Sequence, residues 1–157
     1  MKFNLLTKVY MLGSICLLIL ALSCKKKSIE SDIFIKKQWK VDLSASNITP
    51  VLSGRSDHAV AVLYLMDNNE LDYYVYFDQV LQNGDIPTSI KVNLGPSGTN
   101  GSLLIDLQNP VFDANRESKG KLNLNTSTID SLLSQPTYLL VLSSQQGNGL
   151  VRGQINN

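Results

Sequence analysis

The sequence predicts a single all-β domain, a sandwich or a barrel, that contains one short helix. Apolar and polar residues alternate in about eight short segments at a spacing of roughly 8 to 15 residues, with Gly, Asn, Asp and Pro between them. The 157 residues are 43% hydrophobic and 17% charged. This length and composition allow one buried core and a short appendage, and they exclude two independent cores.

The predicted elements follow one another from Trp39 to the end of the chain. Residues 39–43 alternate as a half-buried strand, and residues 59–66, apolar on both faces, are typical of a central strand. A turn at 67–69 leads into a strand at 71–77, so these two strands form a hairpin. The remaining predicted strands are 90–94, 103–107, 121–124, 138–142 and 150–155.

The predicted helix covers residues 126–134. Ser127 and Asp130, three residues apart, approximate a capping box at its start. The Asn148-Gly149 pair indicates a hairpin between the last two strands.

The first 23 residues are typical of a lipoprotein signal peptide. Lys2 and Lys8 precede an uncharged run over residues 9–23, which is shorter than the roughly 20 apolar residues that span a bilayer. The run ends in Ala21-Leu22-Ser23-Cys24, which resembles a bacterial lipobox, although Ala21 stands where that pattern more often has Leu. The resemblance implies acylation of Cys24 and cleavage before it. A signal peptide cut elsewhere, releasing a soluble protein, and a plain transmembrane anchor are the alternatives.

Charge is distributed unevenly along the chain. Residues 25–40 carry six Lys and two acidic side chains, a net charge of +4, whereas residues 41–157 carry a net −5. We therefore expect residues 24–38 to form a basic tether against anionic head groups, before a domain at 39–157. A mildly acidic domain is not suited to binding nucleic acid.

The expected mature chain has no thiol available for chemistry. Cys16 leaves with the signal peptide and Cys24 becomes a thioether. This excludes disulfides, thiolate metal ligands and a cysteine nucleophile.

The residue types that usually carry catalysis or bind metal form no clear pattern. His58, the only histidine, follows Asp57, but no Gly-x-Ser-x-Gly nucleophile elbow accompanies it. A calcium site from Asp67, Glu70 and Asp72 is open, although these residues also suit an ordinary polar turn. The glycine-rich residues 95–101 precede a strand pattern rather than the helix that a phosphate loop requires. We therefore expect no catalytic residue, no metal and no cofactor.

The strand at 71–77 offers one candidate binding face. Its alternation places Asp72, Tyr74 and Tyr76 together, opposite Leu71, Tyr73, Val75 and Phe77. Tyr74 and Tyr76 could form an exposed platform for a glycan or a protein. Alternatively, loops or a second sheet cover them.

Residues 41–155 resemble the CHRD domain, which occurs in chordin and in bacterial secreted proteins and lipoproteins. The stretches that carry the resemblance are 43–51, 59–65, 71–75, 95–101, 103–107, 120–122, 138–142 and 149–155. The resemblance implies a Greek-key β-sandwich of immunoglobulin-like or superoxide-dismutase-like appearance. The matched single residues are Gly95, Gly98, Gly101, Arg152, Gly153 and Gln154.

The chain departs from the family pattern at its polar positions. Lys91 and Asn93 occupy the usual His-x-His, Leu142 replaces a further histidine, and Leu150 replaces an acidic residue. A metal-binding or acid-base role of that cluster therefore does not carry over. For Arg152 we favour a structural role, a buried guanidinium that ties the sheet to loop carbonyls, over ligand recognition.

Together these features predict a non-catalytic binding or structural domain that a lipid anchor holds in the envelope of a Gram-negative bacterium. Lys25, rather than Asp, after the cysteine favours the outer membrane. The expected partners are the membrane and an unidentified protein or polysaccharide. The alternatives are an envelope hydrolase or metal-dependent enzyme that uses carboxylates and His58, and a surface adhesin that uses Tyr74 and Tyr76.

Overall fold

The computed structural model describes residues 33–107 and 111–156, which belong to one compact unit, Ile33–Asn157. The predicted signal peptide, Cys24 and the start of the predicted tether lie outside the described residues. No helix in the described part of the chain is long and apolar enough to cross a membrane.

Eight strands and one α-helix form the domain. They are β1 (Ile35–Ser44), β2 (His58–Met66), β3 (Glu70–Phe77), β4 (Pro87–Leu94), β5 (Leu103–Asp106), β6 (Glu117–Asn123), α2 (Thr126–Ser134), β7 (Thr137–Ser143) and β8 (Val151–Asn156). Short 3₁₀ turns, η1 (Ala45–Asn47) and η2 (Gln82–Gly84), follow β1 and precede β4.

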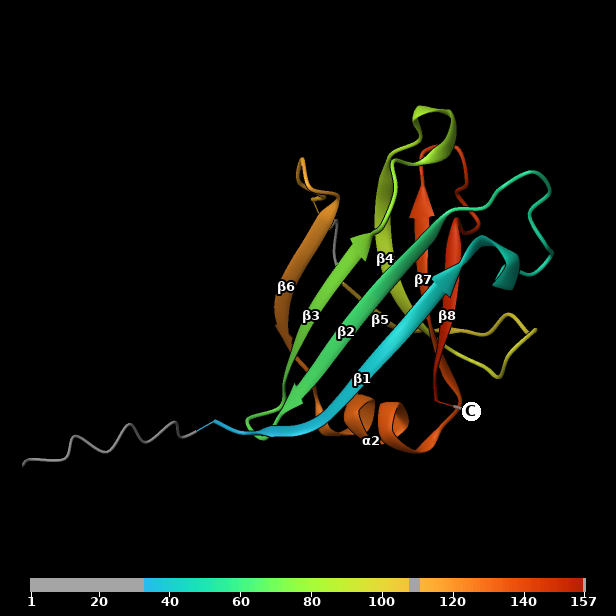
Figure 1. Cartoon of the computed structure of the whole chain (residues 1–157). Helices are drawn as coiled ribbons and strands as arrows, with labels where there is room; N and C mark the ends of the chain where they lie inside the picture. Colours follow the sequence, from blue (N-terminus) through green and yellow to red (C-terminus); the bar gives the residue numbers. More distant parts are fainter. Residues whose placement is uncertain (1–32, 108–110, 157) are drawn as a thin grey trace, which may run out of the picture. The chain divides into compact units, whose positions relative to one another are not determined.

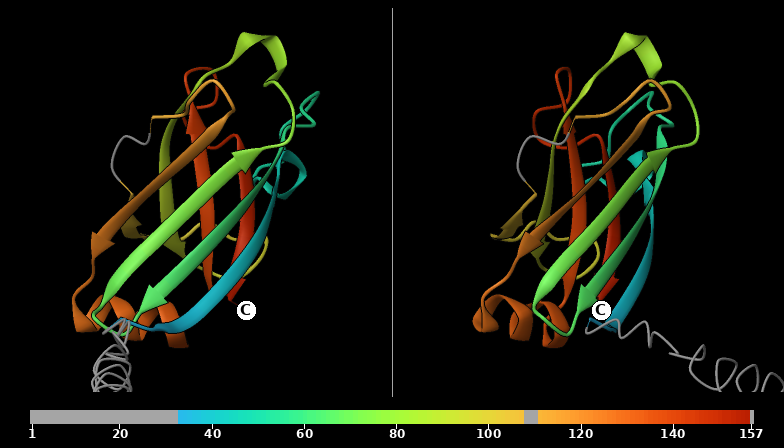
Figure 2. Two further views of the ribbon diagram at one scale, coloured as in Figure 1. Left: turned by 60° about the vertical axis from the view of Figure 1, so that its left-hand side comes forward. Right: turned by 90° about the vertical axis from the view of Figure 1, so that its left-hand side faces the viewer.

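The strands form one antiparallel sheet in the order β5-β4-β7-β8-β1-β2-β3-β6. This sheet curls, so that β6, β3, β2 and β1 face β5, β4, β7 and β8 as two layers (Figures 1 and 2). The pairs β3–β6 and β4–β7 join strands three apart in sequence, as in Greek-key connections. The predicted all-β fold with one short helix is confirmed.

The core lies between the two layers. Every second side chain of β2 and β3 is buried, including Leu63 and Leu65 on β2 and Leu71 and Val75 on β3, as strand alternation requires. Helix α2 covers one end of the core through Ile129 and Leu132.

The cap of α2 differs from the expected one. Asn125, not Ser127, is the N-cap, and its side-chain oxygen accepts a hydrogen bond from the Thr128 amide at 2.8 Å. Asn is as good a cap as Ser, and its extended backbone precedes the helix by one residue.

Three strands begin three or four residues earlier than predicted. β1 starts at Ile35, within the segment assigned to the tether, β4 starts at Pro87, and β6 starts at Glu117. Residues 35–38 are all exposed at the start of β1, so period-two burial does not mark them as a strand. Their pairing with β2, rather than their side chains, makes them a strand.

The two ends of the domain are formed by different elements. The chain enters beside the turn between β2 and β3, where Phe34 exchanges hydrogen bonds with Asp67. Helix α2 lies at the same end, whereas the β1–β2, β3–β4, β5–β6 and β7–β8 connections lie at the other (Figure 1).

Candidate binding surfaces

Three tyrosines share the outer side of β2 and β3. Tyr74 and Tyr76 lie on the same side of β3, as predicted, and Tyr64 of β2 joins them from its place opposite Asp72. All three are partly exposed, whereas Tyr73 points into the core. We call Tyr64, Tyr74 and Tyr76 the tyrosine face.

Charged side chains border the tyrosine face along the edge strand β6. Lys119 lies opposite Tyr74, Glu117 opposite Tyr76, and Lys121 opposite Asp72. The Lys121 ammonium lies 2.9 Å from carboxylate oxygens of both Asp72 and Glu70, which raises the pKa of this lysine. A hydrogen bond to the Glu117 carboxylate raises the pKa of Tyr74 to about 12, so Tyr74 remains a neutral donor.

A hollow of about 440 Å³ opens on this surface, with Tyr64, Asp72, Tyr74, Lys119 and Gly120 among its lining residues. Gly120 makes room for the Tyr73 ring, because a Cβ there would lie 2.5 Å from the Tyr73 hydroxyl oxygen. Asp72 Oδ1 is buried and has no hydrogen-bond partner among the described residues, while Oδ2 is paired with Lys121. The hollow thus combines aromatic rings with lysine donors.

Arg152 is buried beneath the glycine-rich loop. Its guanidinium lies 3.5 Å from the centre of the Tyr138 ring, and it donates to the carbonyl oxygen of Pro96 at 2.9 Å. Burial lowers the pKa of Arg152. These contacts join β8 to the loop, and the guanidinium is not presented to solvent.

At each of the family-matched glycines, a larger side chain would either clash with a neighbour or strain the backbone. A Cβ at Gly101 would lie 1.5 Å from the Leu94 carbonyl oxygen, and one at Gly153 would lie 2.4 Å from the Asp42 carbonyl oxygen. Gly95 and Gly98 have positive φ angles of 138° and 77°. Gln154 completes the arrangement by donating to the Gly95 carbonyl at 3.0 Å.

His58 and Asp57 do not act on each other. His58 Nδ1 lies 3.1 Å from Asp78 Oδ2, and both side chains are about 40% exposed. Asp57 is buried and accepts from Arg55 at 2.6 Å and from the Gln82 amide at 3.0 Å. Asp57 therefore does not orient the histidine as a catalytic carboxylate would.

A buried charge network was missed at the sequence level. Arg55 bridges Asp57 and Asp85, with 2.9 Å between Arg55 Nη2 and Asp85 Oδ2. Burial alone would raise the pKa of Asp85, but hydrogen bonds donated by Ser143, the Gln145 amide, Ser144 and the Ile86 amide lower it below its usual value. The sequence contains no signal for this network, because the loops that hold Arg55, Asp57 and Asp85 also contain apolar residues and the further charge of Asp78.

The carboxylates proposed for calcium are engaged elsewhere. Asp67 Oδ1 accepts from the Phe34 amide, while Glu70 and Asp72 bind Lys121. Within the described residues, no three His, Cys, Asp or Glu side chains are grouped closely enough to hold a metal ion.

The residues that stand at the positions of the family histidines are not suited to binding a metal ion in this chain. Lys91 and Asn93 lie on one side of β4, and Asn93 Nδ2 donates to the Tyr138 hydroxyl at 3.2 Å. Leu142 is diagonal to Lys91 in the β4–β7 register, and Leu150 is fully buried. An amine, an amide and two aliphatic side chains do not form a first-row metal site.

Comparison with known protein families identifies one match. The model of the CHRD domain matches residues 39–155, which is most of the chain. Neither curated proteins nor solved structures gave a match.

Proposed function

Because the chain belongs to the CHRD domain family, we propose that it is a lipid-anchored protein of the bacterial cell envelope whose domain binds a partner without catalysis. The anchor is acylated Cys24, and the domain is the non-catalytic binding or structural module that the family suggests. One observation carries the anchoring part of the proposal, namely the exposed apolar residues at the start of the domain.

Ile33, Phe34 and Ile35, here called the N-terminal edge, are 43%, 65% and 54% exposed. The exposed Lys36 and Lys37 follow directly. Apolar side chains beside lysines suit the boundary between head groups and acyl chains. The edge begins nine residues after Cys24, and nine extended residues reach roughly 30 Å, so an acylated Cys24 allows it to contact the bilayer surface.

The primary experiment measures the intact mass of the protein purified from a Gram-negative host membrane, beside a Cys24→Ser variant. A mass that corresponds to cleavage before Cys24 plus acyl chains, lost in the variant, supports the anchor. An unacylated soluble species would instead make this a secreted binding protein.

Fractionation of the same membranes tests the location. Lys25 after the cysteine favours export to the outer membrane. Recovery only in the inner-membrane fraction would contradict that placement.

The N-terminal edge has its own test. Phe34→Ser should weaken sedimentation of unacylated chain 25–157 with vesicles that contain anionic lipid. Val51→Ser is the matched control, because Val51 is 73% exposed and lies in the β1–β2 connection at the other end. Equal sedimentation of both variants would remove the edge from the proposal.

The tyrosine face supports a second candidate, an adhesin that binds polysaccharide. Pyranose rings stack on tyrosine faces, and Lys119 and Glu117 supply hydrogen-bonding groups at the border. Changing Tyr74 and Tyr76 together to Ser should abolish retention on an insoluble polysaccharide matrix, while changing exposed Val111 to Ser should not. Unchanged retention of the double variant would refute this role.

The enzymatic alternative depends on His58. Its partner Asp78 is as exposed as His58 itself, so the pair is solvated rather than enclosed in a catalytic pocket. Any hydrolase activity found in the purified protein and lost in His58→Ala would establish that alternative.

A further inference from the structure

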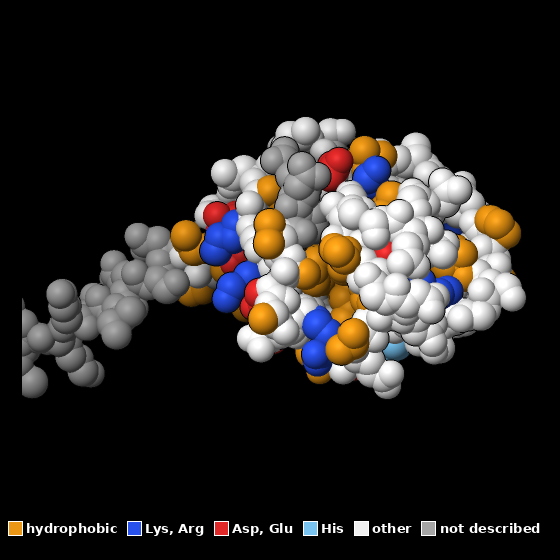
Figure 3. Space-filling model, turned by 90° about the horizontal axis from the view of Figure 1, so that it is seen from above, with side chains coloured by type: hydrophobic (Ala, Val, Ile, Leu, Met, Phe, Trp, Pro, Cys, Tyr) orange, Lys and Arg blue, Asp and Glu red, His pale blue; other side chains and the backbone are white. Residues whose placement is uncertain are grey.

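The end of the domain opposite α2 contains a second hollow, of about 340 Å³. It lies among the end of β3, the β3–β4 connection and the segment before β6, and apolar side chains gather there when the domain is seen from above (Figure 3). Its apolar lining residues are Phe77, Val80, Leu81, Ile86, Pro87 and Phe112. We call it the end hollow.

The end hollow has a buried floor and an exposed rim. Phe77 and Leu81 are buried, and the Phe77 ring packs at 57° against Phe112 with 5.5 Å between ring centres. Val80 and Ile86 stand at the rim, 77% and 64% exposed. A concave group of apolar side chains that is open to water is typical of a ligand site, and its volume lies at the lower end of the small-molecule range, about 300–1,000 Å³.

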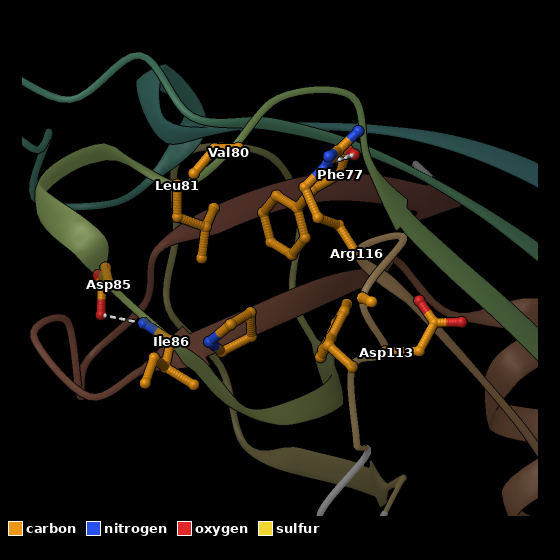
Figure 4. A pocket seen from close by; sticks show the side chains of 10 residues that line it. Phe77, Val80, Leu81, Asp85, Ile86, Asp113 and Arg116 are labelled. Carbon is orange, nitrogen blue, oxygen red and sulfur yellow. Dashed lines mark hydrogen bonds between the residues drawn. The ribbon is translucent and has the colours of Figure 1, made fainter.

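The two carboxylates of the lining are not available to a ligand. Both oxygens of Asp85 are occupied by Arg55, serine hydroxyls and backbone amides. Asp113 Oδ1 accepts from the amides of Asn115 and Glu117, and its carboxylate points away from the hollow (Figure 4).

Unlike the two carboxylates, Arg116 has hydrogen-bonding groups available to a ligand. Its Nε donates to the Phe77 carbonyl oxygen at 3.0 Å, which fixes the guanidinium at the rim beside Phe77 (Figure 4). Its terminal nitrogens have no hydrogen-bond or ion-pair partner in the described part of the chain. A fixed guanidinium with open donors is suited to a carboxylate.

We propose that the end hollow binds a single-chain carboxylic acid, with the alkyl chain over Phe77, Leu81 and Phe112 and the carboxylate on Arg116. The volume suits a fatty acid of medium chain length. The proposal uses only residues of the domain, so it does not depend on whether Cys24 is acylated.

The test is calorimetric titration of chain 25–157 with hexanoate, octanoate and decanoate below their micelle concentrations, and with octanol. This chain contains the whole compact unit and lacks an acyl group that would compete. Affinity should rise by up to about fourfold per methylene as the chain fills the hollow. Octanoate should bind at least about tenfold more tightly than octanol. No saturable binding of any of the acids would overturn the proposal.

Three variants locate the binding. Val80→Asp and Ile86→Asp place a charge on the exposed rim and should weaken octanoate binding at least tenfold, while Val51→Asp, equally exposed but elsewhere, should not. Arg116→Gln should weaken octanoate but not octanol. Equal octanoate binding by the Val80 and Val51 variants would exclude the end hollow, and equal octanoate binding by Arg116→Gln and the unchanged chain would exclude the carboxylate contact. Circular dichroism confirms that each variant is folded.

Discussion

Gly153→Ala should be strongly destabilising, because Gly153 lies where the two layers of the sheet meet. β1 and β8 share a single ladder pair, Ser44 with Arg152, and Gly153 follows directly on β8. A Cβ at Gly153 would lie 2.4 Å from the Asp42 carbonyl oxygen and 2.6 Å from a Val41 methyl carbon. The first of these neighbours is backbone, so it cannot rotate away.

The magnitude follows from the shift that the methyl group requires. An ordinary carbon–oxygen contact is close to 3.4 Å, so β1 and β8 must separate by about 1 Å at their junction. Overpacking of a buried site costs about 1–3 kcal/mol, and a fixed backbone neighbour places this variant at about 3 kcal/mol. With an m-value of about 2 kcal/mol/M, the urea midpoint should fall by about 1.5 M.

Gly147→Ala is the matched control for this measurement. Gly147 lies in the β7–β8 connection, and a Cβ there meets nothing within 4 Å. Its midpoint should remain unchanged or rise slightly, since Ala restricts the unfolded chain. If both variants unfold at the same urea concentration, the close approach of β8 to β1 does not constrain the fold as argued here.

The remaining predictions concern charged and phenolic groups. Arg152→Met should lower the free energy of unfolding by about 2–4 kcal/mol, and Arg152→Lys should recover less than half of this loss, as measured by urea unfolding. Asp85→Asn should cost about 3–5 kcal/mol at neutral pH, because it leaves Arg55 incompletely paired. The folded state lowers the pKa of Asp85 below its unfolded value, which is near 3.9. The ionised carboxylate therefore stabilises the folded state above that value, and this stabilisation is lost as the pH falls through the folded pKa. The difference in the free energy of unfolding between Asp85→Asn and the unchanged protein should therefore shrink from pH 7 to pH 3. Tyr74 should ionise only near pH 12 in an absorbance titration, and Glu117→Gln should move that transition to lower pH; an unchanged transition would contradict the hydrogen bond.

Strand positions could be predicted because burial in a two-layer sheet imposes a period of two. β3 shows this directly: Leu71, Tyr73, Val75 and Phe77 are buried, as the alternation indicated. Tyr64 was not assigned to the tyrosine face, because β2 is apolar on both sides and its pattern alone does not say which side faces water.

The buried network could not be predicted, because it depends on loops that are distant in sequence. Arg55 and Asp85 are 30 residues apart, and Ser143 lies a further 58 residues along the chain. Each of these residues is ordinary in its local sequence. Only the curled sheet brings the β1–β2, β3–β4 and β7–β8 connections to the same end, where their polar groups satisfy one another.

The residues that close the sheet and the residues that line the end hollow lie in different parts of the sequence. Gly101, Arg152 and Gly153 lie in stretches that carry the family resemblance, and each of them fits one strand or loop closely against another. The residues of the end hollow, from Phe77 to Ile86 and from Phe112 to Arg116, lie outside those stretches. Membership of the CHRD family therefore accounts for how the sheet closes. The residues of the end hollow lie in connections, where side chains can change without disturbing that closure, so substitutions there test ligand binding separately from folding.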